Sequence, residues 1–248
     1  VDRCLIAHPA IQSLRVLPAS GRRWPDADEV EVVASTGGDV AVRGTADDAI
    51  TTAEGPDRVR EVALGRRWTL PVEAFWQVHP AAADTLATAV LELLDPRPGE
   101  SAWDLYGGAG LFAAALAKAV GPAGRVTLVE AAEASVQAAR DNLADLPQIE
   151  VVPARVETAL TRRRIAGPVD LVVLDPPRTG AGRDVVRALA GSDARAIAYV
   201  ACDPAAFARD VRTFRSAGWR LAAVRAYDMF PMTQHVECVG LLTPGDGR

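Results

Sequence analysis

The chain has 248 residues, enough to bury a full hydrophobic core and to form one large domain, or one domain and part of a second. Hydrophobic residues make up 49% of it, yet no apolar run could span a bilayer, which excludes an integral membrane protein. The three cysteines, Cys4, Cys202 and Cys238, are too few for a disulfide framework, and no pair has CxxC spacing. We therefore predict no metal site, no membrane partner and, since no leader opens the chain, a cytoplasmic protein. The net charge of −5 neither indicates nor excludes a nucleic-acid partner.

The first part of the chain reads as short β-strands. Polar and apolar residues alternate over 29–35, Thr36–Asp39 supplies turn chemistry, and 40–43 returns as a hairpin partner. We predict a small β-rich domain over residues 1–74, with strands over 29–35, 40–43, 58–64 and 68–72.

From residue 75 to residue 248, helical and strand patterns alternate. A stripe formed by Leu86, Val90 and Leu93 predicts a helix over 79–94. Further helices are predicted over 110–120 and 132–143, and strands over 103–106, 125–130, 149–152, 169–174, 196–200, 220–226 and 236–242. Such alternation is typical of a parallel sheet with helices on both faces. The last two strands have no helix between them, so we expect them to pair antiparallel at one edge. This α/β order predicts the Rossmann-like sheet of class I methyltransferases.

A glycine loop and an acid mark the ends of the first two strands of this sheet. The segment Asp104–Gly110 (Asp-Leu-Tyr-Gly-Gly-Ala-Gly) follows the first strand and opens a helix, so its backbone can approach a ligand. The second strand ends in Glu130, and an acid there can accept the ribose hydroxyls of a nucleoside cofactor. Alternatively, the loop is a structural turn and Glu130 a solvated strand end.

Two further segments follow later strands. In Asp175–Arg178 (Asp-Pro-Pro-Arg) two prolines stiffen the backbone, and Arg178 stands where enzymes that methylate exocyclic amines usually have an aromatic residue. Cys202 follows its strand at the start of a helix, whose positive dipole end is expected to favour the thiolate, the form that a nucleophile requires. The alternative is a small core cysteine.

An acid also stands among the apolar residues of the last strand. Strand alternation places Glu237 on one face and Cys238 on the other, and Cys238 is predicted to be a core residue. Because an unpaired buried acid is costly, Glu237 is either a functional group or an exposed edge residue.

Taken in order, these motifs resemble the bacterial RNA 5-methyluridine methyltransferase family. The similarity covers residues 75–243 and rests on the segments Phe75–Gln77, Asp104–Gly110, Asp175–Arg178, Tyr199–Pro204 and Asp228–Glu237. It implies an enzyme that uses S-adenosylmethionine (SAM) to methylate C5 of a uracil in ribosomal or transfer RNA. By the resemblance, Cys202 is the nucleophile and Glu237 the base. The remaining implied site residues are Gln77, Asp104, Tyr106, Gly108, Gly110, Glu130 and Asp175 for the cofactor, with Phe75 and Arg178 for the substrate.

The chain departs from the family pattern at several positions. Asp203 and Leu111 stand where the family frequently has asparagine, and Arg155 is expected to replace another asparagine. A carboxylate at position 203 is expected to disfavour the thiolate. The family's N-terminal RNA-binding barrel has no counterpart here, which predicts weak RNA binding. Cys4 resembles the last of four iron–sulfur ligands found in some members, but the others are missing, so no cluster is expected. Two other functions stay open: methylation of another base or a small molecule, and a non-catalytic RNA-binding relic.

Overall fold

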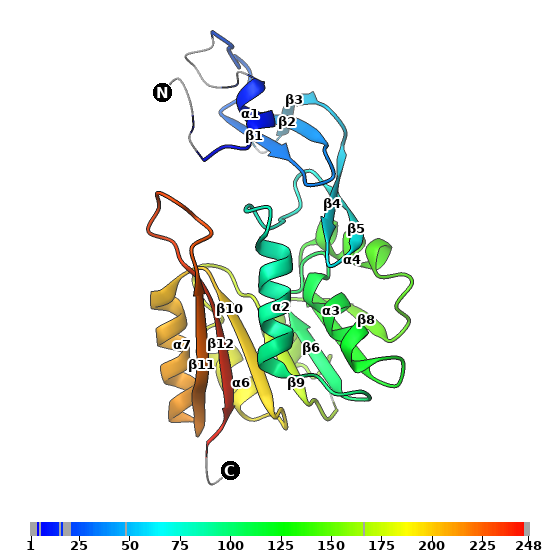
Figure 1. Ribbon diagram of the computed structural model, residues 1–248, viewed down its shortest axis with the longest axis vertical. Helices are drawn as coiled ribbons and strands as arrows, with labels where there is room; N and C mark the ends of the chain where they lie inside the picture. Colours follow the sequence, from blue (N-terminus) through cyan, green and yellow to red (C-terminus); the bar gives the residue numbers. More distant parts are fainter. Residues whose placement is uncertain are drawn as a thin grey trace. The chain divides into compact units, whose positions relative to one another are not determined.

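The computed structural model describes residues 4, 6–14, 16, 21–47, 49–165 and 167–245. The chain divides into two compact units, residues 1–74 and 75–248. Figure 1 labels their helices and strands.

The first unit contains two small antiparallel sheets. The elements are α1 (Pro9–Ser13), β1 (Glu29–Ala34), β2 (Val40–Ala46), β3 (Ala49–Glu54), β4 (Arg58–Ala63) and β5 (Arg66–Pro71), with β1-β2-β3 forming one sheet and β4-β5 the other. The four predicted strands are all present. The strand β3 was not predicted, because both of its faces are largely exposed and its residues show no alternation of polar and apolar side chains.

Polar contacts tie this unit together. Arg43 is 5% exposed and donates to the carbonyls of Val42, Glu54 and Pro56 and to the Asp57 carboxylate. A buried guanidinium is stable only when its donors are paired in this way.

The second unit is a mixed seven-stranded sheet with order β11-β12-β10-β9-β6-β7-β8. Its strands are β6 (Ser101–Leu105), β7 (Arg125–Glu130), β8 (Ile149–Pro153), β9 (Leu171–Leu174), β10 (Ala196–Ala201), β11 (Trp219–Tyr227) and β12 (Glu237–Pro244). Its helices are α2 (Ala82–Leu94), α3 (Leu111–Val120), α4 (Glu133–Asn142), α5 (Val156–Thr161), α6 (Arg183–Ala190) and α7 (Pro204–Ser216). The pairings from β8 to β10 are parallel, whereas β12 runs antiparallel to both β10 and β11, which confirms the predicted α/β sheet.

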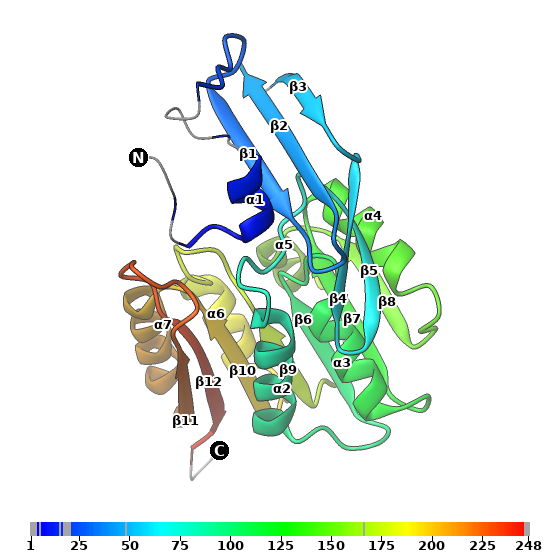
Figure 2. The ribbon, with the colours of Figure 1, turned by 45° about the horizontal axis from the view of Figure 1, so that its top comes forward.

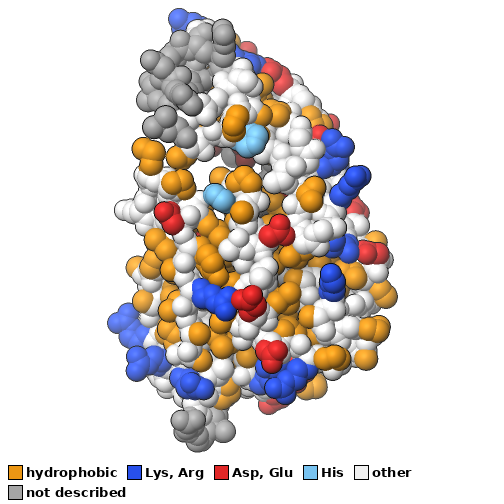
Figure 3. Space-filling model, viewed as in Figure 1, with side chains coloured by type: hydrophobic (Ala, Val, Ile, Leu, Met, Phe, Trp, Pro, Cys, Tyr) orange, Lys and Arg blue, Asp and Glu red, His pale blue; other side chains and the backbone are white. Residues whose placement is uncertain are grey.

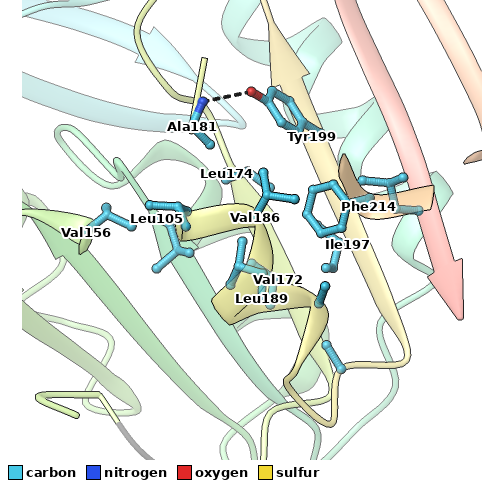
Figure 4. Close-up of a cluster of buried hydrophobic side chains, with 14 of the residues drawn as sticks. Leu105, Val156, Val172, Leu174, Ala181, Val186, Leu189, Ile197, Tyr199 and Phe214 are labelled. Carbon is cyan, nitrogen blue, oxygen red and sulfur yellow. Dashed lines mark hydrogen bonds between the residues drawn. The ribbon is translucent and has the colours of Figure 1, made fainter. Parts of the chain in front are cut away.

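Helices cover both faces of this sheet (Figure 2). On one face, α2 and α3 pack against each other, and on the other face α6 lies between α5 and α7. A buried cluster fills the space under α5, α6 and α7, with Leu105, Val172 and Leu174 of the sheet facing Val186 and Leu189 of α6 (Figure 4). Among the described residues no helix is long and apolar enough to cross a membrane.

The ends of the parallel strands form one edge of the sheet, which we call the carboxyl edge. β12 is antiparallel, so it begins at this edge, with Glu237 as its first residue. The end of α2 lies at the opposite edge, because Arg195, just before β10, donates to the Leu94 carbonyl. The connection that precedes α2, residues 75–81, therefore enters at the carboxyl edge.

Candidate active site

The carboxyl edge gathers most of the predicted site residues. β6 ends before Tyr106, β7 ends at Glu130, β9 ends before Asp175, and β10 ends before Cys202. Ala201, the last residue of β10, pairs with Cys238 of the antiparallel β12. The next residue, Cys202, therefore lies opposite Glu237. Parallel topology brings together side chains that are far apart in the sequence.

The loop after β6 packs tightly against the sheet and is open on one side. Tyr106 ends the predicted strand in a left-handed conformation, with φ of 62°, which is strained for a tyrosine. Gly110 has φ of 98°, a conformation that residues with a side chain rarely adopt, and a Cβ there would also lie 2.5 Å from Leu143. At Gly108 a Cβ would meet nothing within 4 Å, so the backbone there faces open space. Gly108 is the point at which a ligand can approach the loop.

Backbone donors fix the Glu130 carboxylate. It accepts hydrogen bonds from the N–H of Gly108 at 2.9 Å and from those of Ala131 and Ala132 at 2.7 Å each. Of about four acceptor positions on a carboxylate, three are thus used within the protein. Glu130 is therefore not a freely solvated strand end, and it keeps an acceptor position for an outside donor.

Asp104 is fully buried beneath the glycine loop. One carboxyl oxygen accepts from the Ala113 N–H at 2.7 Å, and the other has no hydrogen-bond partner among the described residues. Burial raises the pKa of Asp104 to about 8, and the charges of Asp175 and Glu130 act in the same direction. An unpaired buried acceptor next to an open loop suits a ligand that brings a donor or a positive charge.

Two further acids lie near Cys202, the buried Glu237 and the half-buried Asp175. Glu237 is 3% exposed, and burial together with the charge of Asp175 raises its pKa to about 7. Burial alone raises the pKa of Asp175 to about 7. Because β12 lies between β10 and β11, the alternative of an exposed edge position for Glu237 is wrong. The predicted core position of Cys238 is confirmed, since it is 7% exposed.

The Cys202 thiol does not have the lowered pKa that the sequence analysis expected from the helix dipole. Burial raises its pKa, the charges of Glu237 and Asp175 raise it further, and Arg178 lowers it. The helix α7 begins only at Pro204, so Cys202 stands before its first turn. Asp203 is its N-cap and accepts from the Ala206 N–H at 2.7 Å, so this carboxylate serves the helix.

The other predicted residues lie around these groups. Phe75 is 67% exposed and Gln77 is half-buried, both in the connection that enters at the carboxyl edge. Tyr106 is half-buried, and its hydroxyl interacts with Glu157 of α5. Of the departures from the family pattern, Leu111 is buried at the start of α3, and Arg155 precedes α5 within 3.8 Å of Glu157.

Tyr199 and Asp210 were not predicted to have a role. Both are buried, and the Tyr199 hydroxyl donates to the Asp210 carboxylate at 2.7 Å. A signal was present, since Asp210 falls on the same face of α7 as Phe207 and Phe214, and an acid on an apolar helix face requires a partner.

A cavity of about 390 Å³ lies elsewhere, at the opposite edge of the sheet near Arg125 and Glu150. It contains none of the acids or the thiol described above. Among the described residues, no group of three or more His, Cys, Asp or Glu side chains could hold a metal ion.

The strand order, the glycine loop and the acid at the end of β7 define the class I SAM-dependent methyltransferase fold. The residues fit this cofactor, because SAM carries positive sulfonium and ammonium groups, and the acids Asp104, Glu130 and Asp175 lie together at the carboxyl edge, with one Asp104 oxygen unpaired among the described residues.

Comparison with known proteins narrows the class. Residues 166–244 match the family described as tRNA (Uracil-5-)-methyltransferase, and residues 80–196 match the family described as Methyltransferase small domain. An uncharacterized RNA methyltransferase of Streptomyces coelicolor is 43% identical over 98% of this chain, and one of Streptomyces avermitilis is 42% identical over 98%. The chain spans 58% and 61% of the length of these relatives.

Solved structures agree with this result. The Pyrococcus abyssi tRNA (uracil-54, C5)-methyltransferase, in complex with S-adenosyl-L-homocysteine, is 30% identical with a TM-score of 0.63, over 78% of this chain and 46% of that one. Aeropyrum pernix fibrillarin, at 15% identity and a TM-score of 0.53 over 89% of this chain and 96% of that one, shares the fold alone. The chain belongs to the tRNA (uracil-5-)-methyltransferase family.

Proposed function

We propose that this protein methylates C5 of a uracil in RNA, with SAM as the methyl donor and Cys202 as a covalent nucleophile. The observation that carries the proposal is the position of Cys202 opposite Glu237 at the carboxyl edge. A thiol and a buried acid side by side provide the two groups that this chemistry needs. Family membership supports uracil as the base.

The residues divide the reaction between them. C5 of uracil is a poor nucleophile, and addition of the Cys202 thiolate to C6 creates an enolate whose C5 is reactive. Bound SAM supplies an electrophilic methyl group. Glu237, with a pKa of about 7, then removes the C5 proton, so that the C5–C6 double bond re-forms and the thiolate leaves. A pKa near neutrality suits a group that must accept and release protons.

We assign cofactor binding to Asp104, Gly108, Gly110 and Glu130. In this proposal Glu130 accepts a ribose hydroxyl through its remaining acceptor position, and Gly108 allows the close approach. The buried oxygen of Asp104 and the Asp175 carboxyl favour the positive end of the cofactor. Gln77 and Tyr106 are also assigned to cofactor binding.

Recognition of the target base is assigned to Phe75 and Arg178. The target uracil must leave the nucleic-acid stack before the thiolate can reach its C6 atom. An exposed aromatic side chain can then stack on the uracil ring. Phe75 is 67% exposed, which suits this role. Arg178 is exposed, and its positive charge at Cys202 is suited to a polar base edge or a phosphate.

The direct test is mass spectrometry of nucleosides from unmodified RNA incubated with the protein and SAM. We expect 5-methyluridine. A different methylated nucleoside would contradict uracil-C5 chemistry, and the absence of any methylated product on both ribosomal and transfer RNA would favour a non-catalytic protein.

A further inference from the structure

The segment between β9 and α6, residues 175–182, carries two groups that act on Cys202 in opposite directions. The Asp175 charge raises the pKa of the thiol and the Arg178 charge lowers it. Pro176, Pro177, Arg178 and Gly180 of this segment surround the same small packing gap as Cys202, and this gap is too small to hold a water molecule. Two of them are prolines, which have no N–H to donate. The place of Arg178 beside the thiol therefore depends on how the rest of the segment is held.

Tyr199 and Asp210 hold its far end. One Asp210 oxygen accepts from the Ala181 N–H at 2.8 Å, from the Gly182 N–H at 3.3 Å and from the Tyr199 hydroxyl at 2.7 Å. The Tyr199 oxygen in turn accepts from the Ala181 N–H at 3.1 Å (Figure 4). Tyr199 is 0% and Asp210 1% exposed, so these bonds are shielded from water.

The packing at this point leaves little freedom. Gly180 has φ of 81°, and a Cβ on it would lie 2.6 Å from the Asp210 carboxylate. The Arg209 guanidinium donates to the Thr179 carbonyl. The segment is thus fixed to α7 at several successive residues.

The two anchoring residues come from the elements that flank the nucleophile. Tyr199 lies on β10, which ends just before Cys202, and Asp210 lies on α7, which begins just after it. The helix packs through Phe207, Val211 and Phe214, which need no carboxylate. The charged hydrogen bonds of Asp210 go instead to backbone atoms of the segment that carries Arg178.

We propose that Tyr199 and Asp210 are positioning residues that hold residues 175–182 so that Arg178 stays beside Cys202. The proposal rests on the nucleophilic role of Cys202 in the proposed function. Neither residue contacts the substrate. They act on Cys202 through Arg178, whose charge lowers the pKa of the thiol, whereas the charges of Asp175 and Glu237 raise it.

The test is the rate at which iodoacetamide alkylates Cys202 as a function of pH, with peptide mass spectrometry to separate it from Cys4 and Cys238. Tyr199→Phe and Asp210→Asn should raise the apparent pKa of the thiol and slow alkylation at pH 7 by about two- to tenfold. Arg178→Ala should give the same result. Adding Tyr199→Phe to Arg178→Ala should change little more, because the anchor acts through the arginine.

Trp219→Phe is the matched control. It removes a buried hydrogen bond to the Ala190 carbonyl at the opposite edge of the sheet, and should lower thermal stability without changing alkylation. If Tyr199→Phe behaves like this control, the pair is merely structural. The proposal would also be overturned if Tyr199→Phe slowed alkylation in the Arg178→Ala background as much as it does in the wild type.

Two features of this experiment allow its outcome to be interpreted. Tyr199→Phe leaves the bond between Ala181 and Asp210 intact, so it decides the matter if Asp210→Asn does not fold. Alkylation requires neither RNA nor SAM. A thiol that responds as expected in a protein that does not methylate RNA would therefore overturn the proposed function alone.

Discussion

The carboxyl edge has two halves, one at β6 and β7 and the other at β9, β10 and β12, and their acidic side chains differ in hydrogen bonding. At the ends of β6 and β7, four backbone N–H groups donate to Asp104 and Glu130. At β9, β10 and β12, the side chains of Asp175 and Glu237 receive no hydrogen bond from a described residue, and both have pKa values near 7. Acids held by fixed donors have a defined geometry, which suits binding. Of the two acids without donors, Glu237 suits proton transfer because its pKa lies near neutrality, whereas Asp175 is assigned to the cofactor.

Removal of the nucleophile should produce the largest difference between the halves. We expect Cys202→Ala to lower the methylation rate by at least roughly 10⁴-fold, because no other group can add to C6. SAM affinity, measured by calorimetry, should stay within about twofold, since binding belongs to the other half. Cys238→Ala is the matched control, a buried cysteine on the neighbouring strand, and should retain activity. Methylation by Cys202→Ala near the normal rate would exclude the covalent mechanism.

Removal of the base, Glu237, should impair the reaction at a later step than removal of Cys202. Glu237→Gln keeps the size of the side chain but cannot accept the C5 proton, so turnover should fall by about 10²- to 10⁴-fold. Protein–RNA adduct should accumulate on ordinary RNA and be visible on denaturing gels. A variant that turns over freely, or that never forms adduct, would point to another base. Glu150→Gln, at the opposite edge of the sheet, should behave like the wild type.

The binding half should respond through affinity. Glu130→Ala removes the acceptor for the ribose and should weaken SAM binding by about ten- to a hundredfold. At saturating SAM the rate should largely recover. Glu130→Gln preserves the side-chain shape and should have a smaller effect, and Glu133→Ala on the adjacent helix should have none. Wild-type affinity in Glu130→Ala, measured by calorimetry, would remove this residue from the site.

The two halves also predict how stability depends on pH without cofactor. The folded-state pKa values of Asp104, Asp175 and Glu237 lie above the ordinary carboxyl value of about 4, so the folded state binds more protons than the unfolded state. Stability should therefore fall as pH rises from about 4 to about 8. Thermal unfolding measured across this range should show a decreasing midpoint, and Glu237→Gln should flatten the decrease. A midpoint that rises over this range would contradict the assigned pKa shifts.

The smallest expected effect is the contribution of surface charge to RNA binding. The net charge is −5, and on the face of the second unit seen in Figure 3 the Lys and Arg side chains form no continuous track and have Asp and Glu side chains among them. We expect a shallow salt dependence corresponding to roughly two to four phosphate contacts, each adding about −0.7 to −0.9 to the slope of log K against log salt. Tight, steeply salt-dependent binding would reveal a basic track that this face does not display.

Much of the fold could be predicted from the sequence because apolar periodicity reports directly on burial. The strands of the second unit follow from it, and the antiparallel pairing of β11 with β12 follows from the absence of a helix between them. The short exposed strand β3 has no such pattern and was missed.

The site was harder to predict, because its electrostatics arise from residues that only the fold brings together. Strand-end motifs pointed to Cys202 and Glu130, and an acid among apolar strand residues pointed to Glu237; the roles of all three stay predictions. The direction of the Cys202 pKa could not be predicted from the neighbouring helix, since it depends on Glu237 and Asp175 from other strands. For the same reason the link between Tyr199 and Asp210 was not recognised.

The central claim is that Cys202 forms a bond to C6 of a uracil, and RNA that contains 5-fluorouridine tests it most directly. Fluorine at C5 cannot be removed as a proton, so in the presence of SAM the adduct should persist through denaturation. Peptide mass spectrometry should then place one methylated nucleotide on Cys202, with none on Cys4 or Cys238. If the protein methylates ordinary RNA but forms no adduct with the fluorinated RNA, or forms it at another residue, the account is contradicted.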